Sequence, residues 1–226
     1  PEHIKAIGGF EIDNKYVENK LMVPEAVPEK YAKIAAMIQK RYNLHVVKLT
    51  KKMVFDEGYG QKIFDLVNAT YSHLYGYSQL TQKQINQYIK MYLGMLDLEF
   101  VTLIEDWSGD ERKLVGAGIS MPSLSIALQK CHRGRMLPFG WWHLLRAIKF
   151  HKTKIVDLLL VGILPEYRAK GANALLFADL IPIYQKYGIE WGETQVEMET
   201  NTAVQGQWGP LSPIQHKRRE CYIKKI

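Results

Sequence analysis

The sequence predicts an α/β fold in which helices flank a mixed sheet, and three observations support this. Residues 155–164 are almost continuously apolar, which is typical of a strand buried on both faces of a sheet. Residues 63–74 and 81–96 carry apolar side chains at helical spacing. Residues 99–104 and 113–121 favour two strands joined by a turn. Together they indicate a sheet with hairpins on one side and helical crossovers on the other.

The first 50 residues are expected to form a hairpin, a helix and a short strand. Residues 9–23 are largely extended in character, and Asp13-Asn14-Lys15 can form the turn of a hairpin. Pro28 suits the first turn of a helix that continues to about Tyr42. Residues 45–49 then favour a strand. The helix over residues 81–96 is expected to begin with a capping box.

The second half of the chain predicts a strand–helix–strand order around the apolar strand. The helix that follows this strand begins near Asn173 and ends at Gly188, a residue that suits a helix C-terminus. Residues 191–198 favour another strand, residues 201–208 a short helix, and residues 216–226 a final strand.

Composition and charge exclude several classes of protein. The chain has 226 residues, of which 47% are apolar and 23% charged, so a disordered chain and a disulfide scaffold are excluded. The net charge of +7 favours an anionic partner, but no pattern typical of nucleic-acid-binding domains is found, so no specific nucleic acid is expected. The two cysteines predict a reducing cytoplasm, and the scattered histidines predict no metal site.

A short basic loop between the apolar strand and its helix is the strongest functional signal. Backbone N–H groups in the first turn of a helix lack partners within the helix and attract anions. Gly171 would let an oxygen approach the main chain, and Arg168 and Lys170 add positive charge. These residues predict either a cradle for a diphosphate or a solvated surface loop. Neither a Walker loop nor the three-glycine dinucleotide motif is present.

Residues 161–176, with the sequence VGILPEYRAKGANALL, resemble the acyl-CoA-binding motif of the GNAT superfamily of N-acyltransferases. That motif is Arg/Gln-x-x-Gly-x-Gly/Ala after a strand that ends near Pro. The order of predicted elements is similar over residues 43–226. The resemblance implies the GNAT fold, whose fourth and fifth strands, here residues 155–164 and 191–198, splay apart. It also implies acetyl-CoA or another acyl-CoA as co-substrate, without a metal.

The resemblance also implies roles for individual residues. The diphosphate would be held by the backbone N–H groups of Arg168, Ala169, Lys170, Gly171, Ala172 and Asn173. The edge at Gly162 and Ile163 would pair with the pantetheine arm, and Asn201 would contact the cofactor. Two residues depart from the family pattern. Asn173 replaces the last Gly/Ala, and Trp208 stands about where the family has a Tyr that protonates the leaving thiolate.

Carboxylates on the strand after the motif helix are candidates for the base that an amine acceptor requires. Glu193, Gln195, Glu197 and Glu199 alternate with other residues and would share one face, and Glu197 or Glu193 is the favoured base. The alternative is a solvated face, or pairing with Arg and Lys of the C-terminal segment. Tyr222 on the final strand is the candidate acid in place of the missing phenol.

Three functions follow as hypotheses. The first is an acyl-CoA-dependent N-acyltransferase, most simply one that transfers acetyl to a small-molecule or peptide amine by direct attack in a ternary complex. The second is an acyl-CoA-binding module of the same fold with weak or no turnover, as Trp208 would explain. The third is a basic protein that binds nucleic acid or a membrane surface.

Two segments lie outside the core of the predicted domain, which comprises residues 43–226. Residues 1–42 resemble the end of a preceding GNAT domain in a tandem protein, or are an ordinary N-terminal hairpin and helix that extend the sheet. Residues 123–153 are an insertion in which aromatic residues lie among cations, including Arg133. The plainest interpretation is a helix with its tryptophans in the core. A lid, a membrane contact through residues 133–154, a homodimer contact, or a contact with a missing N-terminal domain are the alternatives.

Overall fold

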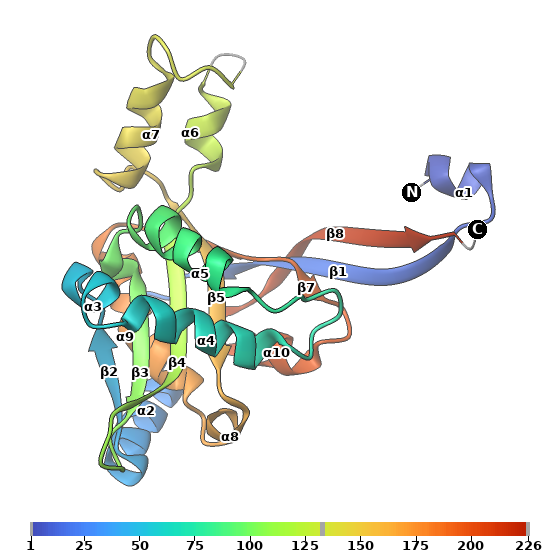
Figure 1. Cartoon of the computed structure of the whole chain (residues 1–226). Helices are drawn as coiled ribbons and strands as arrows, with labels where there is room; N and C mark the ends of the chain where they lie inside the picture. Colours follow the sequence, from blue (N-terminus) through green and yellow to red (C-terminus); the bar gives the residue numbers. More distant parts are fainter. Residues whose placement is uncertain (1, 132–133, 225–226) are drawn as a thin grey trace.

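The computed structural model describes residues 2–131 and 134–224, which form one mixed sheet flanked by helices (Figure 1). The eight strands follow the order β2-β3-β4-β5-β6-β1-β7, and β8 pairs with β1. β5 and β6 are parallel, and the other pairs are antiparallel. The strands are β1 (Glu11–Met22), β2 (Leu44–Lys48), β3 (Val101–Asp106), β4 (Lys113–Pro122), β5 (Ile155–Ile163), β6 (Trp191–Thr194), β7 (Glu197–Met198) and β8 (Ile214–Ile223). The predicted fold class is therefore confirmed.

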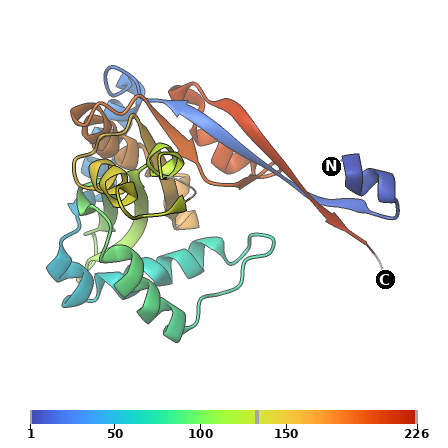
Figure 2. The ribbon, with the colours of Figure 1, turned by 90° about the horizontal axis from the view of Figure 1, so that it is seen from above.

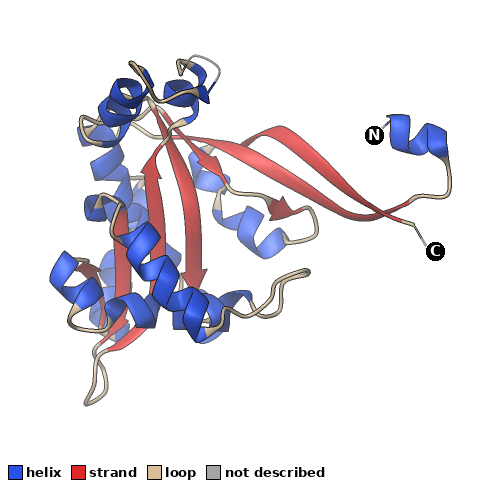
Figure 3. Ribbon diagram, turned by 45° about the horizontal axis from the view of Figure 1, so that its top comes forward, coloured by secondary structure: helices blue, strands red, loops and turns tan. Residues whose placement is uncertain are grey.

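Helices cover both faces of the sheet, as Figures 2 and 3 show. α4 packs over β4 and β5 on one face, and α2 and α9 pack together on the other. The helices are α1 (Glu2–Ile7), α2 (Glu29–Tyr42), α3 (Lys51–Phe55), α4 (Tyr59–Tyr71), α5 (Gln82–Tyr88), α6 (Ser125–Gln129), α7 (Gly140–Ile148), α8 (Pro165–Arg168), α9 (Asn173–Lys186) and α10 (Thr202–Gln207). The other helices are the π-helix η1 (Ile89–Leu93) and the 3-10 helices η2 (Leu98–Phe100) and η4 (Gly209–Leu211). None of the described helices is both long and apolar enough to cross a membrane.

Two sequence signals, Pro28 and the Thr81 capping box, correctly predict where helices begin. α2 begins directly after Pro28 and ends at Tyr42, as expected. The capping box before α5 is present: the Thr81 side chain accepts from the Gln84 backbone, and the Gln84 side chain accepts from the Thr81 backbone. These contacts depend only on residues three positions apart, so the sequence contains all the information they need.

The hairpin expected within residues 9–23 is wrong. These residues form one strand, β1, which pairs on one edge with β6 and β7 and on the other with β8. Ile12 faces Tyr222 and Asn14 faces Cys221, so the pairing with β8 skips Asp13. The polar triplet that suggested a turn is therefore a β-bulge within a continuous strand. As a consequence, the N-terminal segment is an integral part of the sheet.

The strand expected over residues 191–198 is interrupted. β6 ends at Thr194 and β7 begins at Glu197, and Gln195 and Val196 between them are exposed. The even alternation that would have placed Glu193 and Glu197 on one face is therefore broken.

Two parts of the chain project from the body (Figure 1). The paired strands β1 and β8 continue beyond the rest of the sheet as a two-stranded ribbon, with α1 at its end. α6 and α7, from the insertion, stand away from the sheet as a helical hairpin. Arg133 of the insertion and residues 225–226 of the predicted final strand lie outside the described residues.

Candidate functional site

The site begins where β5 and β6 separate. Their parallel pairing extends from Ile155 opposite Trp191 to Leu158 opposite Thr194, whereas β5 continues to Ile163. Past Leu158, this edge of β5 has no strand partner within the described residues. The expected splay of the fourth and fifth strands is therefore confirmed.

A cavity of about 500 Å³ lies at this splay. Its volume is within the range of roughly 300–1,000 Å³ that is typical of small-molecule sites. It is lined by the end of α4 and the loop after it, the free edge of β5, the link between β6 and β7, the first residue of α9, and α10. The lining residues that carry polar side chains are Tyr16, Thr70, Tyr71, His73, Tyr75, Tyr77, Arg168, Asn173, Thr194, Gln195, Glu197, Asn201, Gln207 and Trp208.

Glu197 is the carboxylate in the wall of this cavity. Its Oε1 accepts from Trp208 Nε1 at 2.9 Å, and its Oε2 accepts from Asn19 Nδ2 at 3.5 Å. Burial raises the pKa of Glu197 to about 7, although both hydrogen bonds act to lower it. A carboxyl group with a pKa near 7 exchanges protons readily at neutral pH, as a general base requires.

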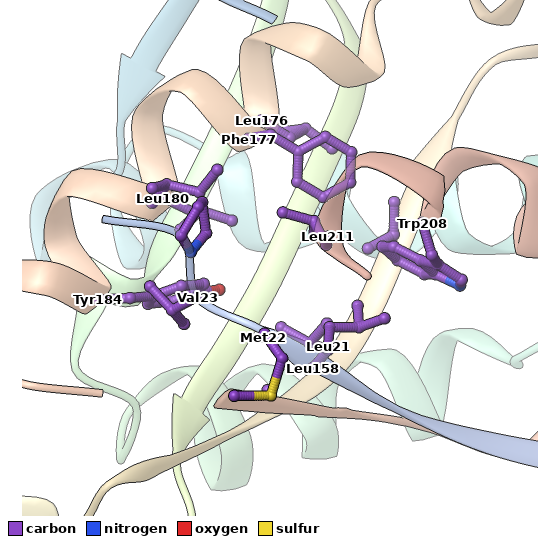
Figure 4. A pocket seen from close by; sticks show the side chains of 14 residues that line it. Leu21, Met22, Val23, Leu158, Leu176, Phe177, Leu180, Tyr184, Trp208 and Leu211 are labelled. Atoms are coloured by element: carbon purple, nitrogen blue, oxygen red, sulfur yellow. The ribbon is translucent and has the colours of Figure 1, made fainter. Parts of the chain in front are cut away.

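Trp208 separates the site from the core. A small apolar cavity of about 40 Å³ lies behind it, and Figure 4 shows the residues around this cavity, with Trp208 at one side. Leu158, Val161 and Trp208 line both cavities. Trp208 is only 2% exposed and packs on Phe177, while its N–H donates to Glu197. Its ring thus completes the core, and its polar edge orients the carboxylate.

Tyr71 is the most enclosed phenol of the site. Its hydroxyl donates to the carbonyl oxygen of Val161, on the free edge of β5, at 3.1 Å. Burial raises the pKa of Tyr71; the charge of Glu197 also raises it, and the charge of Arg168 lowers it. The phenol is therefore neutral at ordinary pH, in the electric field of one anionic and one cationic side chain.

Arg168 is the cationic residue among those that line the cavity. Its Nε donates to the carbonyl oxygen of Ile163 at 2.8 Å, so the side chain is held at the end of β5. Asn173 and Asn201 line the same cavity. Asn201 caps α10, since its Oδ1 accepts from the backbone N–H of Val204 at 3.3 Å. Of the predicted cofactor residues, the fold thus brings Ile163, Arg168, Asn173 and Asn201 together.

The other predicted cofactor residues lie outside the lining. These residues are Gly162, Ala169, Lys170, Gly171 and Ala172. Ala172 is buried, and the Lys170 ammonium lies over the rings of Tyr167 and Tyr42. A Cβ on Gly162 would lie 3.0 Å from the hydroxyl oxygen of Thr70, so this glycine lets α4 approach β5.

Gly171 also has a different role from the expected one. Its φ is +82°, and a Cβ would lie 3.3 Å from Cγ2 of Ile34 on α2. The side of Gly171 on which a Cβ would lie is therefore packed against α2, so the missing side chain makes room for α2, whereas we expected it to make room for a ligand oxygen. Its conformation is one that L side chains rarely adopt.

Part of the predicted anion cradle is already engaged. The backbone N–H groups of Arg168, Gly171 and Ala172 donate to carbonyl oxygens of Leu164, Arg168 and Tyr167. The prediction that all six amides from Arg168 to Asn173 are open to a ligand is therefore wrong for these three. The reason is local: the loop folds into the short helix α8 and a turn, which satisfy their own donors.

Two candidate catalytic residues are not in the cavity. The Glu193 carboxylate contacts Lys217 and lies 3.1 Å from His216 Nε2, both on β8. This is the pairing with the C-terminal segment that the sequence left open. Tyr222 pairs with Ile12 near the far end of the β1–β8 ribbon, and its hydroxyl donates to Glu220 at 2.5 Å. Neither residue lines the cavity.

Sequence reasoning missed Tyr71, Thr194 and Asn19. Thr194 Oγ1 accepts from the backbone N–H of Asn19 at 2.9 Å, which ties β1 to the cavity wall beside Glu197. No sequence signal marks Asn19, because the sequence predicts a separate hairpin over residues 9–23. Tyr71 was assigned to the apolar face of its helix, and this periodicity does not reveal a phenol that reaches a strand edge.

The sequence matches no family model and no curated protein. Solved structures do resemble the chain. A GCN5-related N-acetyltransferase from Sphaerobacter thermophilus has a TM-score of 0.58 at 10% identity, over 98% of this chain and 54% of that one. The GCN5-related glucosamine N-acetyltransferase region of a fungal multi-domain β-N-acetylglucosaminidase has a TM-score of 0.56 at 10% identity, over 98% and 22%. A tandem GNAT protein from the clavulanic acid biosynthesis pathway has a TM-score of 0.50 at 13% identity, over 98% and 57%.

Because the sequence identities are only 10–13%, these structural similarities show the fold and nothing more. The chain has the fold of the GCN5-related N-acetyltransferases, as the motif at residues 161–176 led us to expect. It spans about half the length of the Sphaerobacter thermophilus protein and of the tandem GNAT protein.

Proposed function

We propose that this chain, which has the GCN5-related N-acetyltransferase fold, is an acyl-CoA-dependent N-acyltransferase. The observation that carries the proposal is one cavity that joins the free edge of β5, the Arg168 cation and the Glu197 carboxyl group. A binding site for a thioester and an amine needs these parts together: an edge to orient the extended arm, a cation for phosphate, and a base. Acetyl is the simplest acyl group for this role.

The residues present fit acyl-CoA. The backbone of β5 beyond Leu158 has no strand partner within the described residues and can form strand-like hydrogen bonds with the amides of the pantetheine arm, beside the hydrogen bonds that Val161 and Ile163 already accept from Tyr71 and Arg168. Arg168 can pair with phosphate, and Asn173 and Asn201 offer neutral hydrogen-bonding groups beside it. When bound, acyl-CoA would supply the activated acyl group.

A carboxylate of this chain, Glu197, would accept the proton that the acceptor amine loses. An amine is nucleophilic only when unprotonated, so the acceptor must lose a proton before or during attack. The Glu197 carboxylate would accept this proton at Oε1 or Oε2, directly or through water, while Trp208 and Asn19 hold it in place. Tyr71 would keep its proton, because its raised pKa makes it a weaker acid than a thiol, so the thiolate would leave as an anion and take a proton from water.

The direct test is release of free thiol from acetyl-CoA with a panel of amines. Thiol release that depends on an amine, together with mass-spectrometric detection of the amide, would support the proposal. A rise in melting temperature with acetyl-CoA but no turnover with any amine would instead favour the binding module. The observation behind this alternative is Trp208, which stands about where the resemblance implies a phenol. If acetyl-CoA causes neither amine-dependent thiol release nor a rise in melting temperature, both functions are contradicted.

Arg168 provides a prediction for cofactor binding. Arg168→Gln is expected to weaken acetyl-CoA binding by about 10- to 100-fold, since one charge-assisted hydrogen bond contributes roughly 1.5–3 kcal/mol. Lys170→Gln is the matched control, because its ammonium lies over Tyr167 and Tyr42 outside the cavity. Calorimetric titration measures both. An equal loss in the two variants would show that general charge near the loop, not Arg168, attracts the phosphate.

Trp208 provides a prediction for pH dependence. Its hydrogen bond lowers the pKa of Glu197, so Trp208→Phe should raise this pKa further above 7. The loss of activity on acidification should then begin at a higher pH, by up to about one unit for one hydrogen bond. Profiles of kcat/KM with an aromatic amine, which does not itself titrate near pH 7, give the measurement. Phe177→Leu is the control. It weakens the packing against the Trp208 ring but keeps the indole N–H donor, so the pH dependence of kcat/KM should not shift.

A further inference from the structure

In the helical hairpin of α6 and α7, small side chains are buried and large apolar side chains are exposed, which is the reverse of an ordinary protein core. The small buried residues are Ala127, Cys131, Gly140 and Ala147. The large apolar residues point outward, and Leu137 and Phe139 are 75% and 73% exposed. Trp141 and Trp142 are 44% and 43% exposed, so the expectation of a helix with its tryptophans in the core is wrong. The two helices bury their small side chains, whereas the bulky ones stay largely exposed and include a packed row of Trp141, Trp142 and Phe150.

Large apolar side chains are exposed along the hairpin and in the link between its two helices. We call this exposed set the α6–α7 surface and define it by Leu128, Met136, Leu137, Phe139, Trp141 and Trp142. Figure 1 shows α6 and α7 standing away from the sheet, so these residues are at the outside of the molecule. Apolar surface of this kind on a projecting element marks a site of interaction rather than a part of the core.

The charges around this surface have a single sign. Residues 123–153 contain no Asp or Glu, although the chain has 23 of them. Among the described residues of the insertion, the cations Lys130, Arg135, Arg146, Lys149 and Lys152 are all exposed. Cations therefore lie in the same segment as the exposed apolar side chains, and this segment contains no carboxylate. An anionic partner complements this arrangement.

We propose that the α6–α7 surface docks on a phospholipid bilayer that contains anionic lipids. Tryptophan and phenylalanine at the tip can enter the interfacial region, and lysine and arginine can remain at the level of the headgroups. Apolar insertion and electrostatic attraction then act together, which stable membrane binding by a short element requires. Nucleic acid would use the cations but leave Met136 and Leu137 exposed to water. A second copy of the surface would place like charges opposite each other.

Vesicle co-sedimentation of the whole chain tests the proposal. Binding to phosphatidylcholine vesicles with about 30 mol% phosphatidylserine should exceed binding to pure phosphatidylcholine at least tenfold, and should weaken with salt. Leu137→Ser combined with Phe139→Ser should lower the binding by tenfold or more without a change in melting temperature. Ile7→Ser combined with Met95→Ser is the matched control, since these residues are 71% and 69% exposed elsewhere, and should bind as the unaltered chain does.

A second pair of variants tests the charge. Lys149→Glu with Lys152→Glu should abolish the preference for anionic vesicles, whereas Lys51→Glu with Lys83→Glu, also exposed, should retain most of it. The proposal is overturned if the Leu137/Phe139 variant binds vesicles as well as the unaltered chain. It is also overturned if the unaltered chain binds only duplex DNA, or if the α6–α7 surface proves to hold a dimer that the Leu137/Phe139 variant dissociates in gel filtration.

Discussion

Glu197→Gln is expected to lower the rate of acyl transfer by about 10²–10⁴-fold, the range typical of a lost general base. The substitution removes the group that accepts the proton of the amine, while its amide oxygen can still accept from Trp208 Nε1. Because Glu197 lies in the wall of the cavity rather than at Arg168, the affinity for acetyl-CoA should not change. The effect should therefore fall on kcat, with binding of the co-substrate intact.

Glu193→Gln is the matched control for this experiment. Glu193 is a carboxylate on β6, the strand that precedes β7 along the chain. It pairs with Lys217 and lies outside the cavity, so its loss should leave the rate within a few-fold. Equal losses in the two variants would contradict the assignment of the base. So would an unchanged rate in Glu197→Gln.

The pH dependence of stability gives an independent check on the same carboxyl group. The pKa of Glu197 is raised by burial to about 7, above its unfolded value, so the folded state disfavours the carboxylate. Ionisation therefore destabilises the fold progressively as pH rises from the unfolded pKa of about 4.5 to about 7, and no further above it. Glu197→Gln should then match the unaltered chain in melting temperature near pH 4 and exceed it at pH 8. A melting-temperature difference that is the same at both pH values would show that the pKa is not raised.

Much of the fold could be predicted because its signals are local. The apolar run of β5, the Pro28 start of α2 and the Thr81 capping box depend on neighbours in sequence, and each lies where expected. The splay of β5 from β6 was also expected, through the resemblance carried by residues 161–176. Arg168 and Glu197 were both identified as candidates, and the fold brings them to one cavity.

The errors concern long-range contacts. Asp13-Asn14-Lys15 is as polar as a turn, and only the pairing of Asn14 with Cys221, near the other end of the chain, identifies it as part of a bulged strand. Glu193 and Glu197 differ in role because one faces Lys217 and the other faces Trp208. Which tertiary partner a carboxylate meets is not encoded in the spacing along its own strand. The same reason explains why Asn19 was missed.

Gly171→Glu is expected to destabilise the fold, rather than to block the cofactor selectively. Gly171 has a φ of +82°, and a side chain there would be directed at Ile34 and Ile38 of α2. Left-handed backbone costs roughly 1–2 kcal/mol for a non-glycine residue, and overpacking costs about 1–3 kcal/mol more. For a chain of this length the sum corresponds to a fall in melting temperature of at least about 5 °C.

Gly171→Ala separates the two contributions. It keeps the unfavourable φ and adds only a Cβ, 3.3 Å from Cγ2 of Ile34. In an Ile34→Ala background this contact is absent, so Gly171→Ala should destabilise the protein less there than in the unaltered chain. The difference in the double-mutant cycle is the energy of packing against α2. If Gly171→Glu instead keeps the original melting temperature and loses only acetyl-CoA binding, the residue faces the ligand, and the loop would be a phosphate cradle of the kind that its sequence first suggested.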